Sequence, residues 1–321
     1  MRSLKQPFFK TFFILTALAL CLGSAYLFAG LAEGSWNYNI ARRINILAAI
    51  AVTAVSVGLS SVVFQTITSN HILTPSIMGL DNLYVFIQTV VIYFLGTGEM
   101  EMMTRQNDFL LTLAIMTAAS TSIFIFMFKT NCANVYFAVL AGLVFGIAFG
   151  GLSSFMQVII DPSEFSILEG RMFASFNKIN LPLMGISSLI VALSSVWIAL
   201  DFKNLDVMTL GRAHSVALGV NYEKIVLKTF VAVSLLTSAS TVLVGPVTFL
   251  GILIVSIARF IFPTYRHDIL VPGTILVGIC ALISGMLVTE RYLQFTVPLS
   301  VIINFAGGIC FIYLVLKLKR I

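Results

Sequence analysis

The chain has 321 residues, of which 59% are hydrophobic and 10% are charged, and its mean hydropathy is +1.03. Soluble domains contain roughly 45–50% apolar and about 25% charged residues, so this composition excludes a soluble globular protein and predicts a polytopic membrane protein. A spanning helix needs about 20 apolar residues, which allows about ten spans and leaves no sizeable soluble domain. The net charge of +6 is therefore interpreted as a determinant of membrane orientation, not as a nucleic-acid-binding surface.

Ten apolar runs follow one another along the chain, and we interpret residues 1–321 as one all-α transmembrane domain. Residues 11–32 form a run that is too long for the core of a signal peptide, so they are interpreted as an uncleaved first span. The runs are apolar on both parities, which favours helices over barrel strands. The predicted spans are 8–31, 44–67, 77–96, 109–128, 134–160, 181–200, 225–244, 249–262, 269–288 and 297–316.

The basic residues predict how the chain is oriented. An even number of spans puts both termini on one side of the membrane. If that side is the cytoplasm, thirteen of the 19 Lys and Arg residues lie in inner loops. Because cytoplasmic loops carry an excess of Lys and Arg, the sequence predicts that both termini are inside. The six outer basic residues would be Arg42, Arg43, Arg105, Arg171, Lys178 and Arg291.

Small residues in the fifth predicted span indicate close helix packing. Gly142, Gly146 and Gly150 recur every four residues and form two overlapping G-x-x-x-G patterns. Small side chains let helix backbones approach closely in lipid, where the hydrophobic effect does not drive helices together. The pattern predicts a tight helix contact and carries no information about substrate.

A mostly non-spanning segment, residues 205–223, interrupts the second half of the chain. Its apolar residues recur at three- and four-residue spacing, which predicts one face of a short helix, and Gly219 suits the helix C-terminus. A helix this short is marginal alone in water, so we expect it to lie between the bundle and a soluble partner. The alternative is an ordinary amphipathic helix at the membrane surface. The face comprises Leu210, Ala213, Val216, Ala217 and Val220.

The chain lacks the motifs of an enzyme or an ATPase. No G-x-x-x-x-G-K-[ST] loop occurs, so the chain cannot hydrolyse ATP alone. His71, His214 and His267 fall in predicted inner loops and are interpreted as solvated, so neither a metal nor another cofactor is expected. The four cysteines are interpreted as packing residues. Ionisable residues are almost absent from the spans, which argues against an ion-coupled carrier.

Several segments, in this order, resemble the permease subunits of iron–siderophore, haem and vitamin B12 ABC importers, which share the type II importer architecture. The departures are His71 after Asn70, where the family has proline, Ser256-Ile257 in place of its P-H, and the loss of an acid and a glycine before the last span. The matching segments are Ala41-Arg42-Arg43-Ile44, residues 70–79, Leu140-Ala141-Gly142, Leu210-Gly211 with Ala217-Leu218-Gly219-Val220, residues 245–254, Ala258-Arg259 and Arg266-His267-Asp268.

The resemblance implies a type II ABC importer permease fold and a set of partners. These are two ATP-binding subunits, a periplasmic or lipid-anchored substrate-binding protein, and a second permease subunit. The departures suggest that this second subunit is a paralogue, and a second copy of the chain is the alternative. The expected substrate is a ferric siderophore moved across the bacterial inner membrane. Import of haem or cobalamin by the same architecture stays open, as does an ion-coupled secondary carrier.

The resemblance also assigns roles to residues. The outer arginines would meet carboxylates of the binding protein, although arginines at this depth also reach lipid headgroups. The docking residues would be Arg42, Arg43 and Arg291. The residues that receive the stroke of the ATPase would be Leu210, Gly211, Arg212, Ala217, Leu218 and Gly219. The inner gate would be formed by Asn131, Cys132 and Asn134, for which a plain polar turn is the alternative.

Overall fold

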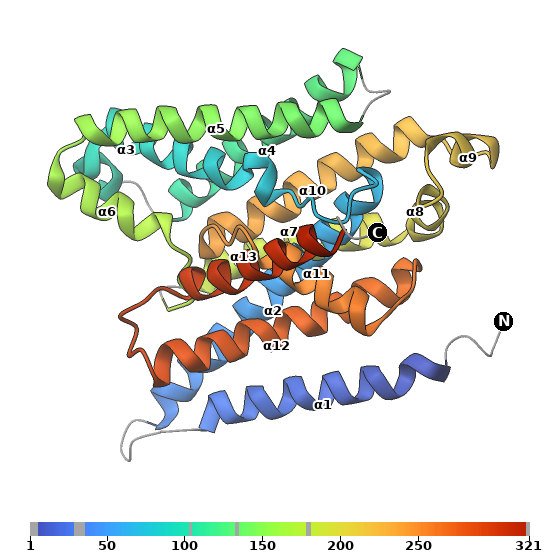
Figure 1. Ribbon diagram of the computed structural model, residues 1–321. Coiled ribbons are helices and arrows are strands. Elements are labelled where there is room, and N and C mark those ends of the chain that lie inside the picture. Colours follow the sequence, from blue (N-terminus) through green and yellow to red (C-terminus); the bar gives the residue numbers. More distant parts are fainter. Residues whose placement is uncertain (1–5, 29–35, 103–104, 132–134, 178–180, 319–321) are drawn as a thin grey trace.

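The computed structural model describes residues 6–28, 36–102, 105–131, 135–177 and 181–318. Every regular element within these ranges is a helix (Figure 1), which confirms the predicted all-α class. The elements are α1 (Gln6–Phe28), α2 (Trp36–Ile67), the π-helical turn η1 (Ser76–Leu80), α3 (Asp81–Met102), α4 (Arg105–Asn131), α5 (Val135–Ile159), α6 (Pro162–Met172), α7 (Leu181–Ala199), α8 (Phe202–Met208), α9 (Arg212–Ala217), α10 (Tyr222–Val244), α11 (Leu250–Ile261), α12 (His267–Arg291) and α13 (Leu299–Leu318).

The helices agree with the ten predicted spans. In the described part of the chain, eight helices are long and apolar enough to cross a membrane, and Leu250–Ile261 and Leu299–Tyr313 are two shorter apolar helices. The sequence placed its shortest span at 249–262, where the 12-residue α11 lies. Helices α6, α8 and α9 are connections between spans, and of these the sequence predicted only a short helix in the region of α9.

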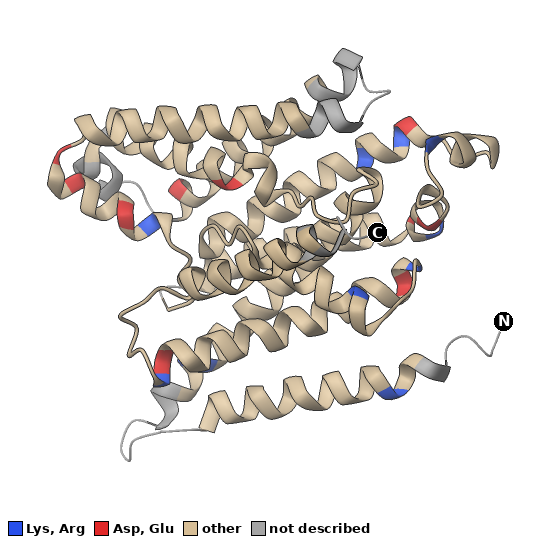
Figure 2. Ribbon diagram, in the orientation of Figure 1, with Lys and Arg blue, Asp and Glu red and all other residues tan. Residues whose placement is uncertain are grey.

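Charged residues mark the two ends of the bundle. Figure 2 shows them mostly at opposite ends, with a largely uncharged middle, as expected of a protein whose centre lies in lipid. The start of α1 and the end of α13 share one end with α8 and α9 (Figure 1). We name this the inner end, following the predicted orientation. The opposite end, with α6 and the end of α12, is the outer end.

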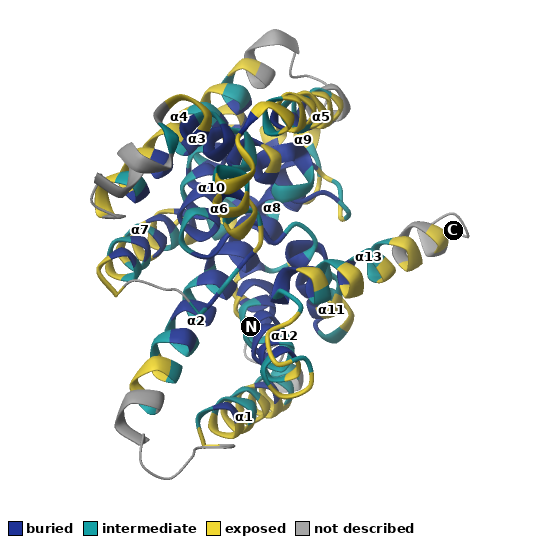
Figure 3. Cartoon of the chain, turned by 90° about the vertical axis from the view of Figure 1, so that its left-hand side faces the viewer, coloured by how far each residue is buried: buried dark blue, intermediate teal, exposed yellow. Residues whose placement is uncertain are grey.

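Three helices form the centre of the bundle. Helices α2, α10 and α12 are mostly buried, whereas α1, α5 and α7 expose most of their surface (Figure 3). The central contact of α2 with α10 uses small polar residues, since the Ser56 hydroxyl donates to the Leu236 carbonyl. Such residues allow close approach and satisfy their own polar groups on the neighbouring backbone.

The glycines of α5 pack against η1 and the start of α3. A Cβ added at Gly79 would lie 2.4 Å from the Cα of Gly146, and one added at Gly142 would lie 2.2 Å from the Met78 side chain. Gly79 also has φ of +94°, a conformation that glycine adopts at no steric cost. The amide of Asn82 donates to the Gly146 carbonyl at 2.9 Å. The predicted tight contact through the glycine pattern is therefore confirmed.

Helix α11 is too short to cross a bilayer core. Its 12 residues span about 18 Å at about 1.5 Å per residue, less than the roughly 30 Å of a bilayer core. The turn before α11 therefore lies at membrane depth, where backbone groups need protein partners. The Phe249 amide donates to Asn304 Oδ1 at 3.2 Å, and the Ser175 amide donates to the Val244 carbonyl at 2.8 Å.

Candidate functional site

The segment predicted as one short helix at the inner end is two short helices. Gly211, with φ of +90°, separates α8 from α9, and Gly219 follows α9 with φ of +84°. Both values lie in the region that favours glycine. The prediction that Gly219 stands at a helix C-terminus is confirmed. The sequence missed α8, because its single helix was drawn around Leu210, which lies in the turn between the two helices.

Large apolar side chains are exposed on and beside α9. Leu210, Val216 and Leu218 are 59%, 56% and 64% exposed, while Ser215 is buried and donates its hydroxyl to the Gly211 carbonyl at 2.7 Å. The remaining predicted coupling residues, Arg212 and Ala217, are also exposed. We call Leu210, Val216 and Leu218 the α9 patch. An outward apolar patch at a polar end of a membrane protein is typical of a contact with another protein.

A buried histidine ties α8 to the rest of the bundle. Asp206 of α8 accepts a hydrogen bond from the backbone amide of His267 at 2.8 Å and lies 2.6 Å from His267 Nδ1. The other ring nitrogen lies 2.9 Å from the Thr66 hydroxyl at the end of α2. His267 is 1% exposed, so its interpretation as a solvated loop residue is wrong. His214 and His71 are exposed, as expected.

The outer end holds the three predicted docking arginines in two different states. Arg43 Nη2 pairs with Glu290 Oε1 at 2.7 Å, and Nη1 donates to the Tyr26 and Leu27 carbonyls at 3.0 Å each. With an 11% exposed side chain, Arg43 therefore joins the ends of α1, α2 and α12. Arg42 and Arg291 are exposed at the outer end. A docking role stays a prediction for all three.

The predicted inner gate falls mostly outside the described residues. Asn131 is the last residue of α4, and Cys132 and Asn134 lie in the connection that the structure does not describe. Their role stays a prediction.

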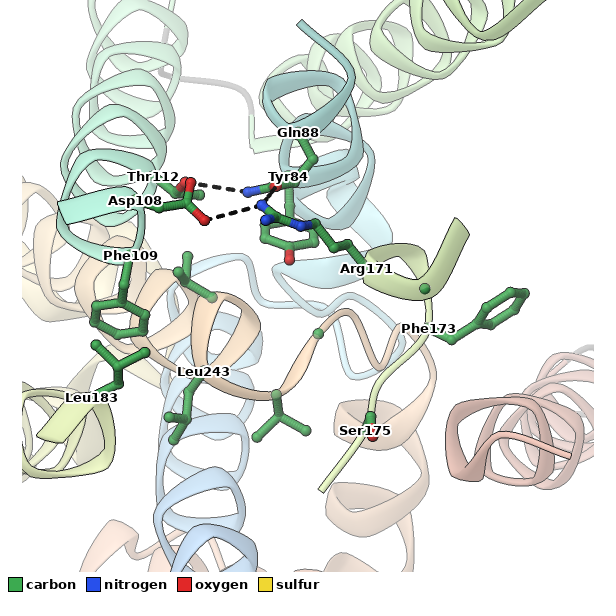
Figure 4. Close-up of a pocket in the computed structure, with 14 residues that line it drawn as sticks. Tyr84, Gln88, Asp108, Phe109, Thr112, Arg171, Phe173, Ser175, Leu183 and Leu243 are labelled. Atoms are coloured by element: carbon green, nitrogen blue, oxygen red, sulfur yellow. Dashed lines mark hydrogen bonds and ion pairs between the residues drawn. The ribbon is translucent and has the colours of Figure 1, made fainter. Parts of the chain in front are cut away.

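A cavity of about 200 Å³ lies toward the outer end between α3, α4, α6 and the end of α10 (Figure 4). Arg171 crosses it, donating to Gln88 Oε1 at 2.7 Å and pairing with Asp108 Oδ2 at 3.0 Å. Gln88 continues the network by donating to the Thr112 hydroxyl at 3.2 Å. Ligand pockets usually measure about 300–1,000 Å³, so this polar network is better suited to holding α6 against α3 and α4 than to binding a large chelate.

A buried carboxylate that was not predicted as a functional residue lies at the start of α3. Asp81, at the start of α3, is buried and accepts a hydrogen bond at 2.7 Å from the hydroxyl of Thr248, in the turn before α11. It is the one acidic residue inside a predicted span, which was the available signal. Its partner could not be inferred, because 167 positions separate the two residues.

Known proteins match this chain over nearly its whole length. The profile of the FecCD transport family matches residues 11–317. The chain is 45% identical over 304 residues to the petrobactin import system permease protein YclO of Bacillus subtilis, covering 95% of this chain and 96% of that protein. It is 32% identical over 282 residues to the petrobactin import system permease protein FatC of Bacillus anthracis, covering 88% and 80%.

A solved structure shares the fold. A metal-chelate type ABC transporter in an inward-facing conformation superposes with a TM-score of 0.82 at 22% identity, covering 96% of this chain and 99% of that one. At 22% identity this similarity shows the fold alone.

Proposed function

Because this chain belongs to the FecCD transport family and is a multi-pass membrane permease subunit, we propose that it moves a ferric siderophore across the bacterial inner (plasma) membrane in an ATP-driven importer. The two similar petrobactin import permeases support this substrate class. The proposed importer contains two ATP-binding subunits, a substrate-binding protein and a second permease, which is a paralogue or a second copy of this chain.

The α9 patch is the observation that carries the proposed coupling to ATP. Its exposed leucines and valine offer an apolar contact to a partner at the inner end, and the chain itself has no phosphate-binding loop. Asp206, His267 and Thr66 connect α8 to α12 and α2. A displacement of the α9 patch by an ATPase would therefore reach two of the three central helices. Nucleotide binding would act by shifting the balance between outward- and inward-facing states.

At the outer end the proposal gives Arg42 and Arg291 the contact with the binding protein. Both are exposed, and arginine pairs with carboxylates in a directional, two-pronged geometry. Such charge pairs serve the rate of encounter and the orientation of the partner as much as affinity. Arg43 supports them indirectly, since its pairing with Glu290 fixes the start of α2 to the end of α12.

Uptake of radiolabelled ferric petrobactin in a strain deleted for this gene tests the proposal. The wild-type gene should restore uptake, and Leu218→Gln should remove most of it, because a polar group in the α9 patch weakens an apolar contact. Leu200→Gln is the matched control, since Leu200 is also an exposed leucine near the inner end but lies outside the patch.

Unchanged uptake with Leu218→Gln would refute the coupling role of the patch. If haem or cobalamin uptake is restored instead of ferric petrobactin uptake, the substrate class is wrong while the importer assignment stands. Transport by the purified chain under an ion gradient without an ATPase would refute the ATP-driven mechanism.

A further inference from the structure

A second cavity, of about 320 Å³, opens at the inner end where α2, α11, α12 and the turn after α8 meet. Its deep part is formed by the buried residues Gln65, Thr66 and His267, and Arg259 forms part of the wall. Exposed side chains surround the mouth. They are Ser69, His71, Thr209 and Tyr265.

The charge of Arg259 lacks a counter-charge within the described part of the chain. Its guanidinium donates through Nε to Gln65 Oε1 at 3.3 Å, and no carboxylate there pairs with it. Two acids that are near lining residues in sequence are paired with other groups, Asp206 with His267 and Asp268 with Arg266 at 2.7 Å. A half-buried guanidinium without an anion is unfavourable, because burial removes its hydration and one hydrogen bond to a neutral amide does not replace it.

An unused donor lies beside this guanidinium. The side-chain nitrogen of Gln65 is buried and has no hydrogen-bond partner, although Gln65 is fully shielded from solvent. Buried polar atoms nearly always have partners. The guanidinium, which has no counter-charge, and the amide nitrogen, which has no acceptor, belong to residues of the same cavity, and none of the described residues that line it is Asp or Glu.

These groups together define the chemistry of the missing partner. The described lining presents a cation, an amide donor and several hydroxyls, and no carboxylate is among them. A group with several acceptor oxygens and negative charge satisfies all of them at once, and arginine binds phosphate in a two-pronged geometry. We propose that this cavity binds a phosphate-class oxyanion through Arg259 and Gln65.

Two sources supply that chemistry at this position. The inner end faces the headgroup region, where phospholipids carry phosphate, and it also faces the aqueous side, where free phosphate is available. Thr209 at the mouth adjoins Leu210 of the α9 patch, and Thr66 and His267 also take part in the link from α8 to the central helices. The two residues proposed to hold the anion, Arg259 and Gln65, belong neither to the α9 patch nor to the outer arginines, so the proposal does not depend on the identity of the transported substrate.

The test uses the purified full-length chain and follows its thermal unfolding. One arm titrates inorganic phosphate against chloride at fixed ionic strength in a neutral detergent. The other adds to the same detergent a short-chain phosphatidylglycerol or, as the phosphate-free comparison, a short-chain diacylglycerol. A ligand that binds only the folded state raises the unfolding midpoint. We expect a rise in the first arm if free phosphate is the ligand and in the second arm if the lipid headgroup is.

Two variants and one control tie the response to the cavity. Arg259→Gln should raise the dissociation constant of the anion by about tenfold or more, since it removes a charge-assisted hydrogen bond. Gln65→Glu supplies the counter-charge internally, so it should raise the midpoint without added anion and abolish the response. Arg266→Gln, whose arginine is paired with Asp268 outside the cavity, should respond as the wild type does.

Absence of a response in both arms for the wild type would overturn the proposal. So would an unchanged response in Arg259→Gln, or an equal loss in Arg266→Gln, which would indicate a diffuse effect of surface charge. Because Gln65→Glu is expected to be more stable than the wild type, a folding defect of Arg259→Gln does not leave the question unanswered.

Discussion

Single glycines determine how closely α5 approaches η1 and α3. Gly146 and Gly79 meet with no side chain between their backbones, and the Asn82 amide bonds to the Gly146 carbonyl beside this contact. A Cβ at Gly146 would lie 2.8 Å from the Gly79 Cα, and backbone cannot rotate away as a flexible side chain can. The same α5 also carries Gly151, whose surroundings are open.

Gly146→Ala should therefore destabilise the fold by about 1–3 kcal/mol, the usual range for inserting a carbon into a packed contact. Gly151→Ala, where an added Cβ meets nothing within 4 Å, serves as the control and should leave stability nearly unchanged or slightly raised. Thermal unfolding of both variants in detergent measures the difference. Equal midpoints for the two would contradict the close contact.

His267 gives a second prediction at this scale. His267→Ala removes the ring that joins Asp206 to Thr66, and it should cost about 1–3 kcal/mol because it leaves partly buried polar groups without partners. His214→Ala, in the exposed part of α9, should change stability by less than about 0.5 kcal/mol. Denaturation midpoints of the two variants check this, and a larger effect at His214 would reverse the assignment.

Residue roles were predictable where they depend on local geometry and not where they depend on distant partners. Gly219 follows a helix whose end is encoded nearby, so its position was predicted. Arg43 and Glu290 are 247 positions apart, and nothing in the sequence around either residue encodes the pair. His267 was misjudged for the same reason, since Asp206 lies 61 positions before it.

At the scale of elements, α8 and α9 behave as two pieces joined by a glycine. Gly211 has φ of +90° and ψ of 166°, a region that side-chain-bearing residues avoid. The turn sets the direction of α9 relative to α8, and α8 is fixed to α12 through Asp206. The sequence predicted helix in this segment from its spacing but not the break, because its periodic apolar residues continue across the turn.

Gly211→Ala should strain this turn by about 1–3 kcal/mol and misalign the α9 patch. Space is available for the added carbon, since nothing lies within 4 Å of it, so the effect comes from backbone conformation alone. Siderophore uptake should fall while the amount of protein in the membrane stays near that of the wild type. Gly170→Ala is the control, because that site is equally open and has no positive φ. Normal uptake with Gly211→Ala would contradict the proposed role of this turn in aligning the α9 patch.

At the scale of the whole molecule, composition and charge were sufficient to predict the apolar spans and to predict that both termini lie at the same end of the bundle. They were not sufficient to say which spans are central. In water an apolar stripe distinguishes the buried face of a helix, but in a membrane both lipid and protein neighbours are apolar. Helices α5 and α10 are therefore both hydrophobic, although one is largely exposed and the other largely buried.

Cysteine labelling tests the overall orientation. The chain, with its native cysteines replaced by serine, is produced without the proposed ATP-binding subunits, which would cover the α9 patch. Leu218→Cys should then react with a membrane-impermeant maleimide in inside-out vesicles but not in protoplasts or spheroplasts. Tyr292→Cys, at the end of α12, should show the opposite pattern, because the two residues are exposed at opposite ends. Labelling of both from the same side would refute the predicted topology.

The half-crossing helix α11 has a consequence for how the bundle can rearrange. The turn that precedes it is secured by a carboxylate from α3, an amide from α13 and a backbone bond to the segment after α6. Water is scarce at that depth, so a polar group that loses its protein partner cannot form a hydrogen bond to solvent instead. Breaking one of these hydrogen bonds while keeping the other two would leave polar groups without partners and add little conformational entropy. Any reshaping of this turn should consequently be abrupt, with the three elements switching together rather than drifting apart one by one.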